Sequence, residues 1–165
     1  MPHSVPVKKL MIPVKEWPQL RVDLNVGTAI KILRIISEER KLEHGHSTPL
    51  VFDEQYNLVG FVHLVDLLKA IRHTCDRPNE PCDLTRVTAT IKDLVVPFAE
   101  SVKEDDTILK ALDVMMDHRV SLVPVMRNGK VLGIVKLADI FNTVAGLLFD
   151  EQDPDERKRL LRDYQ

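Results

Sequence analysis

The sequence predicts an α+β protein made of two tandem copies of one βαββα repeat, in the order strand, helix, strand, strand, helix. Residues 7–71 can be laid over residues 91–145. Within each copy the apolar residues pass from a helical spacing to two short β-rich runs, and then back to a helical spacing. Because each copy is too small to bury its sheet alone, we expect the two to pack sheet to sheet as one pseudo-two-fold module.

Four pairs of matching segments define the repeat. They pair residues 7–13 with 91–97, 28–33 with 107–112, 48–51 with 123–126, and 60–66 with 133–139. In the last pair a glycine and an aspartate stand six positions apart in both copies. The matches place the first copy at residues 7–72 and the second at residues 91–149. Residues 73–90 then form a linker, and residues 150–165 form a tail.

The first helix of each copy is predicted from apolar side chains three and four positions apart. In the first copy this spacing runs from Ala29 to Ile36. In the second copy it covers residues 106–118. Asp105 and Asp106 stand at the head of that second helix, where they are expected to serve as N-cap and as favourable negative charge.

Two short strands are predicted after the first helix of each copy. In the second copy the runs 122–126 and 131–135 are joined through Asn128-Gly129. Asn-Gly between two apolar runs is the strongest short-range signal for a β-hairpin. In the first copy a longer turn joins the runs 50–52 and 58–62.

A final helix in each copy and a helix in the tail complete the expected elements. Apolar residues at helical spacing cover residues 64–71 and 140–148. In the tail, Asp153-Pro154 begins a short helix with acidic residues at its head and basic residues further on. The apolar stripe of the tail helix is thin, so this helix needs a partner surface or frays. The stripe consists of Leu160, Leu161 and Tyr164.

The composition is ordinary for a soluble globular protein. Of the 165 residues, 44% are hydrophobic and 29% are charged, and the formal net charge of −2 argues against a nucleic-acid or membrane partner. No apolar run reaches the length of about 18 residues that a membrane-spanning helix needs, and residues 1–13 do not resemble a signal peptide. Cys75 and Cys82 are too few for a disulfide framework, so we expect a reducing, cytoplasmic compartment.

The paired segments resemble the cystathionine-β-synthase (CBS) domain, which is found as tandem pairs often called Bateman modules. The similar features are the opening segments that end at Pro13 and Pro97, the helix that begins at Thr107, the Val123-Pro124-Val125 strand and the segment 133–139. The resemblance covers nearly the whole chain apart from the termini and the linker. It implies a pair with two clefts, an adenosine-type ligand in one or both of them, and frequent assembly into dimers.

By this resemblance the ribose-binding position falls on Asp66 and Asp139. A carboxylate can accept two hydrogen bonds from vicinal ribose hydroxyls, and a helix start offers N–H groups to a phosphate. The alternative is that both aspartates only cap the helices that follow. Three residues earlier, where the family usually has Ser or Thr, this sequence has His63 and Lys136. Either these two side chains contact a phosphate or they lie on the solvated rim.

The other ligand-binding candidates surround the same motif. Backbone groups at the entrances of the strands would read the edge of the base, an apolar side chain would contact its face, and an arginine at a helix end would reach a phosphate. A small residue just before the second aspartate leaves space for a ligand. These candidates are Ala138, Val123, Pro124, Ser121, Thr48, Pro49, Val96, Pro97 and Arg119. The alternative for the prolines at positions 49 and 124 is that they simply begin strands.

The sequence carries no motif of a known catalytic or cofactor-binding site, so we expect neither an enzyme nor a cofactor. Cys75 and Cys82 lack the spacing of a zinc site, and residues 43–46 are interpreted as a solvated loop, so no metal is expected. We expect a stand-alone regulatory module, a homodimer, that senses an adenine nucleotide (AMP, ADP or ATP) in the cleft between repeats and acts on an unidentified enzyme or transporter. The alternatives are a ligand-free dimerisation or docking module and a nucleic-acid binder.

Overall fold

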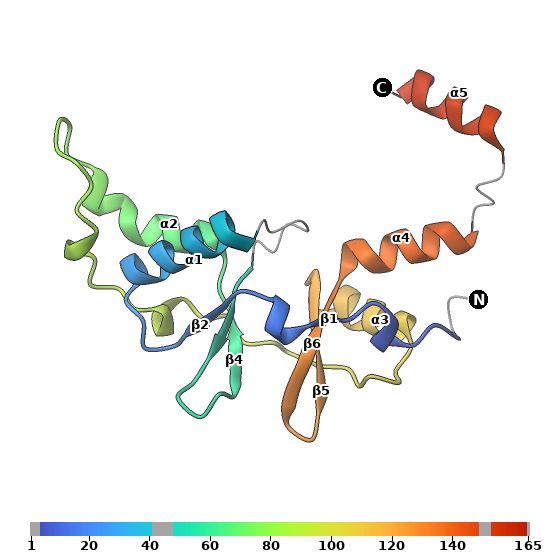
Figure 1. Ribbon diagram of the computed structural model, residues 1–165, viewed down its shortest axis with the longest axis horizontal. Coiled ribbons are helices and arrows are strands. Elements are labelled where there is room, and N and C mark those ends of the chain that lie inside the picture. Colours follow the sequence, from blue (N-terminus) through green and yellow to red (C-terminus); the bar gives the residue numbers. More distant parts are fainter. Residues whose placement is uncertain (1–3, 41–47, 149–152, 165) are drawn as a thin grey trace. The chain divides into compact units, whose positions relative to one another are not determined.

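A computed structural model describes residues 4–40, 48–148 and 153–164 of the chain. Within these residues the fold is mixed α+β with two three-stranded sheets, which confirms the predicted fold class (Figure 1). The strand orders are β1-β6-β5 and β2-β3-β4. The helices are α1 (Val26–Arg40), α2 (Leu64–Arg72), α3 (Ile108–His118), α4 (Leu137–Leu148) and α5 (Pro154–Tyr164). The strands are β1 (Ile12–Pro13), β2 (Gln19–Arg21), β3 (Leu50–Phe52), β4 (Leu58–Phe61), β5 (Leu122–Arg127) and β6 (Lys130–Lys136).

The chain folds into two compact units, each with its own hydrophobic core. Unit 1 is formed by Met1–Met11, Glu100–Val125 and Ile134–Gln165, and unit 2 by Ile12–Ala99 and Met126–Gly133. The core of unit 1 includes Val7, Val102, Ile108, Ala111, Val114, Met115, Val123, Val125, Val135 and Ile140. The core of unit 2 includes Leu20, Val26, Ala29, Val51, Val62, Leu67, Val87 and Ile91. The sheet-to-sheet packing of the two repeats stays a prediction.

Residues 7–11, most of the opening segment of the first repeat, lie in unit 1, with the helix of the second repeat. The backbone N–H of Val7 donates to the carbonyl oxygen of Asp106 (2.7 Å). The N–H of Ile108, the first residue of α3, donates to the carbonyl oxygen of Val5 (2.9 Å). The side chain of Val7 is completely buried in the core of this unit. Residues 5–7 therefore close the core around α3.

The opening segment of the second repeat makes the corresponding contacts in unit 2. The N–H of Ile91 donates to the carbonyl oxygen of Leu24 (2.8 Å), and the N–H of Val26 at the start of α1 donates to that of Ala89 (3.0 Å). The side chain of Ile91 is completely buried. The opening segment of each repeat thus packs with the helices of the other repeat, an arrangement called here the exchange of the opening segments. The repeats of the sequence therefore differ from the packing units of the structure.

The predicted hairpin of the second repeat is confirmed. Asn128 and Gly129 have φ angles of 49° and 76°, between β5 and β6. Positive φ at both central residues is the requirement of a type I′ turn, whose twist matches that of the flanking strands. In the first repeat the longer turn is held by Asp53, whose Oδ1 accepts hydrogen bonds from the backbone N–H groups of Gln55 (3.0 Å) and Asn57 (2.8 Å).

The N-cap of α3 differs from the prediction. The hydroxyl of Thr107, rather than Asp105 or Asp106, caps the helix by accepting the N–H of Lys110 (3.2 Å). The carboxylate of Asp106 instead accepts the N–H of Lys103 (2.7 Å) and lies 3.0 Å from the Lys110 ammonium. Partial burial opposes ionisation of Asp106, but these two hydrogen bonds favour the charged form and hold the pKa of Asp106 below its ordinary value.

Replacing Asp106 with asparagine is expected to lower the free energy of unfolding at pH 7 by about 1 kcal/mol, the usual scale of such a hydrogen bond. A carboxyl with a lowered pKa stabilises the fold above its unfolded pKa, and this contribution is lost as the pH falls through the folded value. The difference between Asp106→Asn and the original protein should therefore shrink below about pH 4. Urea unfolding at pH 7 and pH 3 measures it. Glu39→Gln, at an exposed position of α1, is the control, and an equal difference at both pH values would contradict the assignment.

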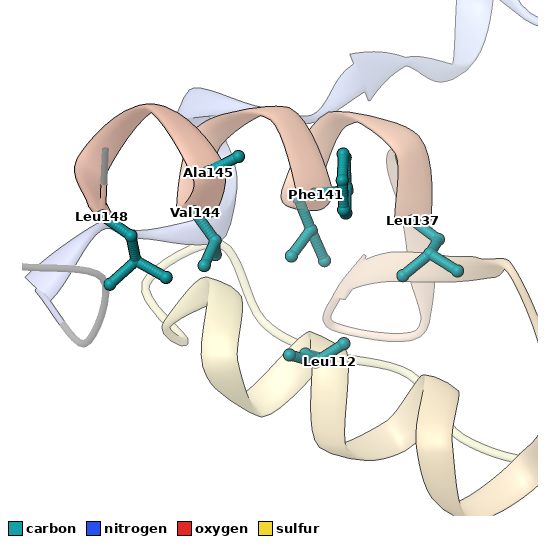
Figure 2. Close-up of a pocket in the computed structure, with 7 residues that line it drawn as sticks. Leu112, Leu137, Phe141, Val144, Ala145 and Leu148 are labelled. Carbon is teal, nitrogen blue, oxygen red and sulfur yellow. The ribbon is translucent and has the colours of Figure 1, made fainter. Parts of the chain in front are cut away.

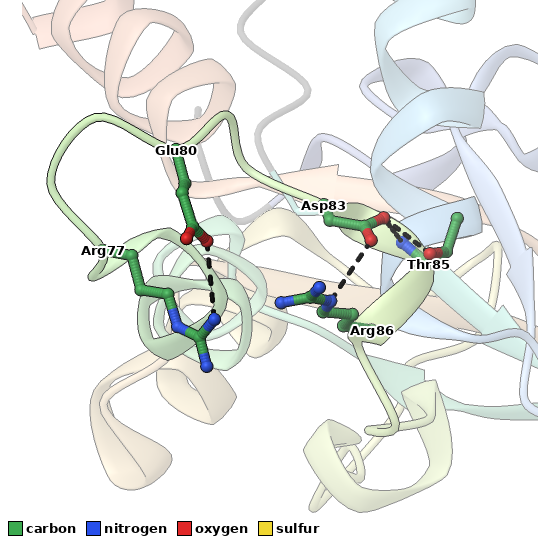
Figure 3. Close-up of polar contacts among 5 residues, drawn as sticks. All are labelled: Arg77, Glu80, Asp83, Thr85 and Arg86. Atoms are coloured by element: carbon green, nitrogen blue, oxygen red, sulfur yellow. Dashed lines mark hydrogen bonds and ion pairs between the residues drawn. The ribbon is translucent and has the colours of Figure 1, made fainter.

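Cys75 and Cys82 form a disulfide, with 4.6 Å between their Cα atoms. This bond differs from what the cysteine count predicts, because two cysteines are too few for a disulfide framework. The seven-residue separation can close because the intervening segment turns back: Arg77 and Glu80 form an ion pair of 3.5 Å, and the N–H of Glu80 donates to the carbonyl oxygen of Arg77 (Figure 3). The cysteine count consequently does not identify the compartment.

The end of the predicted linker is part of unit 2. Asp83 accepts hydrogen bonds from the N–H and the hydroxyl of Thr85 and lies 3.4 Å from Arg86 (Figure 3). The Thr85 hydroxyl and N–H, followed by Arg86, hold the pKa of Asp83 below its ordinary value. Beyond this turn Val87 is buried, and its carbonyl oxygen accepts a hydrogen bond from the side-chain amide of Asn25.

No helix among the described residues is long and apolar enough to cross a bilayer.

Candidate functional site

Two charged candidates of the second repeat, Asp139 and Lys136, come together in unit 1, at the start of α4. Asp139 is the third residue of α4, and its side chain is about one-third exposed. Lys136 is the last residue of β6, and its ammonium lies 3.8 Å from the carboxylate of Asp139. The N–H of Leu137 donates to the carbonyl oxygen of Ser121 (2.9 Å), so the entrance of β5 fixes the first turn of α4. Ala138, between these groups, is exposed.

The other candidates of unit 1 have different surroundings. Val123 and Pro124 are buried in β5, and the carbonyl oxygen of Pro124 accepts the N–H of Val102 (3.0 Å). Because the side chain of Val123 belongs to the core, its place at a ligand would need a rearrangement of that core. Arg119 follows α3 in a left-handed conformation (φ 52°) and is exposed. Its guanidinium is therefore accessible to an anion.

The corresponding charged pair of the first repeat lies in unit 2, at the start of α2. Asp66 is the third residue of α2, its side chain is about one-third exposed, and its carboxylate lies 3.8 Å from the ammonium of Lys69. The N–H of Asp66 donates to the carbonyl oxygen of His63 (3.0 Å). The exposed ring of His63 lies edge-on to Phe61, with 5.1 Å between ring centroids.

The remaining candidates of unit 2 contribute backbone groups. The carbonyl oxygen of Thr48 accepts the indole N–H of Trp17 (2.8 Å). Pro49 is buried, and its carbonyl oxygen accepts the N–H of Val62 (3.1 Å). Val96 exchanges two backbone hydrogen bonds with Phe61, and Pro97 is exposed. Pro49 and Val96 therefore lie beside the strand that leads to His63. Unit 2 contains all four residues, although Val96 and Pro97 belong to the opening segment of the second repeat.

Neither aspartate is the N-cap of its helix, so the capping interpretation is wrong. Each stands in the first turn of its helix, because α2 begins at Leu64 and α4 begins at Leu137. A carboxylate in the first turn is stabilised by the helix dipole and leaves its oxygens accessible. Each unit thus presents a carboxylate beside an ammonium. The carboxylate can accept hydrogen bonds from hydroxyl groups, and the ammonium can neutralise an anion. The described residues contain no cluster of three or more His, Cys, Asp or Glu able to hold a metal ion.

Sequence reasoning missed one concave surface of unit 2, an open cleft of about 610 Å³ at the turn between β3 and β4. The ring of Tyr56 stacks on that of Phe52, with 4.6 Å between centroids, and its hydroxyl donates to the side-chain oxygen of Gln19 (2.7 Å). Tyr56 has φ 62°, a conformation that favours glycine or asparagine. The signal that the sequence offers for this surface is the aromatic residue Phe52, four positions before Tyr56.

The family model described as the CBS domain matches residues 7–73 and 91–146. The chain therefore belongs to the CBS domain family, as the resemblance predicted.

Comparison with individual proteins gives the same fold. The chain is 26% identical over 152 residues to the magnesium and cobalt efflux protein CorC of Buchnera aphidicola subsp. Schizaphis graminum, covering 92% of this chain and 46% of CorC. It thus spans less than half the length of that relative. The CBS domain of the bacterial CNNM/CorC family Mg²⁺ transporter in complex with ATP superimposes with a TM-score of 0.65 and 21% identity, over 87% of this chain and 89% of that one. The cytosolic domain of the Mg²⁺ channel MgtE in complex with ATP gives 0.62 and 21%, over 85% and 49%.

Proposed function

We propose that the chain is a regulatory module that binds an adenine nucleotide of the AMP, ADP or ATP class. The observation that carries this proposal is the pair of Asp139 and Lys136 at the start of α4. Support comes from two domains of the same fold whose structures are complexes with ATP. The role proposed is binding rather than catalysis, and the nucleotide is a regulatory ligand rather than a cofactor.

Each charged group has a distinct task in this proposal. The carboxylate of Asp139 accepts hydrogen bonds from the two ribose hydroxyls, which a carboxylate with two oxygens can do at once. The ammonium of Lys136 moves from Asp139 towards a phosphate, where it acts as a point charge. Asp66 and His63 form the second, corresponding set in unit 2. Binding is transmitted only to the extent that the nucleotide has different affinities for two conformations of the module.

The test is thermal unfolding of the full chain with AMP, ADP and ATP, with S-adenosylmethionine and NAD as comparison ligands. A nucleotide at about 100 times its Kd should stabilise the protein by about 2.7 kcal/mol, and Asp139→Ala should abolish that shift. Asp113→Ala removes the same charge from an exposed position of α3 and should leave the shift unchanged. Asp66→Ala shows whether the second set takes part.

Two other functions remain outcomes of this experiment. If no nucleotide shifts the transition, the module works by docking alone, a function favoured by the replacement of the family's Ser or Thr by His63 and Lys136. Nucleic-acid binding would require a salt-dependent shift of an oligonucleotide in a gel. A nucleotide shift that survives Asp139→Ala and Asp66→Ala together would contradict the proposed site.

We further propose a homodimer with a cytoplasmic location and an enzyme or transporter as its target. Leu64, Val65 and Leu68 of α2 are 40%, 55% and 58% exposed, an apolar face that a second copy would cover. The target class is supported by the relatives, which include an efflux protein and domains of Mg²⁺ transport proteins. The location is supported by the cytosolic domain among the similar structures.

A further inference from the structure

Unit 1 carries an apolar groove of about 230 Å³ between α3 and α4 (Figure 2). Leu137, Val144 and Leu148 project from α4 towards the side of α3 that carries Leu112. The groove is accessible, since Phe141 is 68% and Leu148 66% exposed. Large apolar side chains gathered at an accessible surface are typical of a docking site rather than of a solvated face.

The helix α5 has an apolar stripe without a described contact in a core. Tyr164 stands four positions after Leu160 and three after Leu161, so the three side chains share one face of α5. Their side chains are 47%, 48% and 83% exposed, and every described residue of α5 is exposed. An isolated helix of eleven residues is marginal in water, so α5 gains most of its stability from a surface that covers this stripe.

The chain tethers α5 close to the groove. Only residues 149–153 separate Leu148 at the end of α4 from Pro154 at the start of α5. Five residues span at most about 18 Å when fully extended, so α5 stays near the groove at an effective concentration on the order of millimolar. The two helices also match in length, because twelve and eleven residues rise about 18 Å and about 16 Å.

Opposite charges stand on α3 and on α5. Asp113 and Asp117 stand four positions apart on the exposed face of α3. The part of the chain that the structure describes shows no ion pair for either of them. Arg157 lies on the apolar face of α5, one turn before Leu160, and Lys158 lies beside that face. A docked α5 can therefore bring guanidinium and ammonium groups to these two carboxylates.

We propose that α5 docks in the groove between α3 and α4 of its own chain. The stripe of Leu160, Leu161 and Tyr164 then covers Phe141 and Leu148. Arg157 and Lys158 face the exposed carboxylates of Asp113 and Asp117 on α3. This contact is independent of the nucleotide proposed above. It leaves the apolar face of α2 for a second copy.

The test is amide hydrogen exchange of the full chain, followed at residues 157–164. In the original protein these amides should exchange about tenfold or more slowly than in Leu160→Ala/Leu161→Ala, which removes the stripe but favours the helix. Arg159→Ala/Arg162→Ala, on the opposite face, should keep the protection. Phe141→Ala in the groove should remove it, whereas Asn142→Ala, next to the groove, should not. Unchanged protection of α3 shows that each variant remains folded.

Dilution separates the chain's own groove from that of a second copy. Docking within one chain predicts the same protection over a hundredfold dilution, because the tether fixes the effective concentration. Protection that falls with dilution means that a second copy holds α5, and this result overturns the proposal. Unprotected amides in the original protein, or protection that survives Phe141→Ala, overturn it as well.

Discussion

Replacing Ile91 with alanine is expected to lower the free energy of unfolding of unit 2 by about 2–5 kcal/mol, the range found for such truncations in a core. Ile91 is completely buried among residues of that unit, although it opens the second repeat of the sequence. The truncation leaves a cavity beside Val26 and Leu67, which belong to the same core. The loss should therefore appear in the unit that contains the first repeat's helices.

Residue-resolved hydrogen exchange measures this effect, because it reports the opening of each unit separately. Ile91→Ala should speed exchange at Val51 of unit 2 more than at Val125 of unit 1. Val7→Ala should have the opposite preference, and Lys92→Ala, at the exposed neighbouring position, should affect neither. Loss of protection at Val125 in Ile91→Ala would show that the opening segments are not exchanged.

Replacing Gly60 with alanine is expected to lower the free energy of unfolding by about 2–4 kcal/mol, from overpacking and the loss of neighbouring hydrogen bonds. A Cβ at position 60 would stand 2.2 Å from the carbonyl oxygen of Val96 and 2.9 Å from a methyl carbon of Val95. The carbonyl belongs to the backbone, so the strand edge itself must shift. Such a shift breaks the two hydrogen bonds between Phe61 and Val96.

Gly146 provides the matched control for this substitution. It lies inside α4, and a Cβ there meets nothing within 4 Å. Gly146→Ala should therefore stabilise the protein by about 0.5–1 kcal/mol, because alanine loses less backbone entropy in a helix. Urea unfolding of the two variants should give shifts of opposite sign. A Gly60→Ala protein as stable as the original would contradict the close approach of the two backbones.

The α-helices and the hairpin strands could be predicted because their signals are local, whereas the strand predicted at the opening of the second repeat is wrong, since Ile91–Leu94 form a 3-10 helix. Asn128-Gly129 requires positive φ angles, and the structure has them. The cap of α3 was misassigned by one or two residues, because three consecutive residues, Asp105, Asp106 and Thr107, can all accept an N–H. Local propensity does not choose among such neighbours. The carboxylate of Asp106 accepts the N–H of Lys103 instead, which leaves Thr107 as the N-cap.

The exchange of the opening segments could not be predicted from the repeat. Val7 and Ile91 occupy matching positions and are both apolar, so either would fill the other's place as far as the pattern shows. The match between the repeats therefore predicts that each opening segment fills a core, but it does not predict beside which helix. The disulfide has a similar cause, since the polar residues between Cys75 and Cys82 form their turn through specific contacts rather than a recognised motif.

The candidate site was predictable at its charged residues and less so elsewhere. Asp66 and Asp139 lie at helix starts because both follow the glycine-containing strand, a periodic feature of the sequence. Their cationic neighbours follow different rules: Lys136 precedes Asp139 in unit 1, and Lys69 follows Asp66 in unit 2. The role of Val123 could not be predicted, because an apolar residue in a strand can either fill a core or contact a ligand. Its burial in the core of unit 1 decides for the first role.

The path of the chain links the stabilities of the two units through polymer entropy. Val7 must meet α3 in unit 1, yet residues 12–99 of unit 2 lie between them along the chain. While unit 2 is folded, its structure fixes the two ends of this insertion. Once unit 2 melts, the insertion becomes a flexible loop whose ends must be held together at an entropic cost. Each doubling of the length of a flexible loop costs about 0.6 kcal/mol in closure entropy. Melting of unit 2 should therefore weaken the packing of Val7 in the core of unit 1.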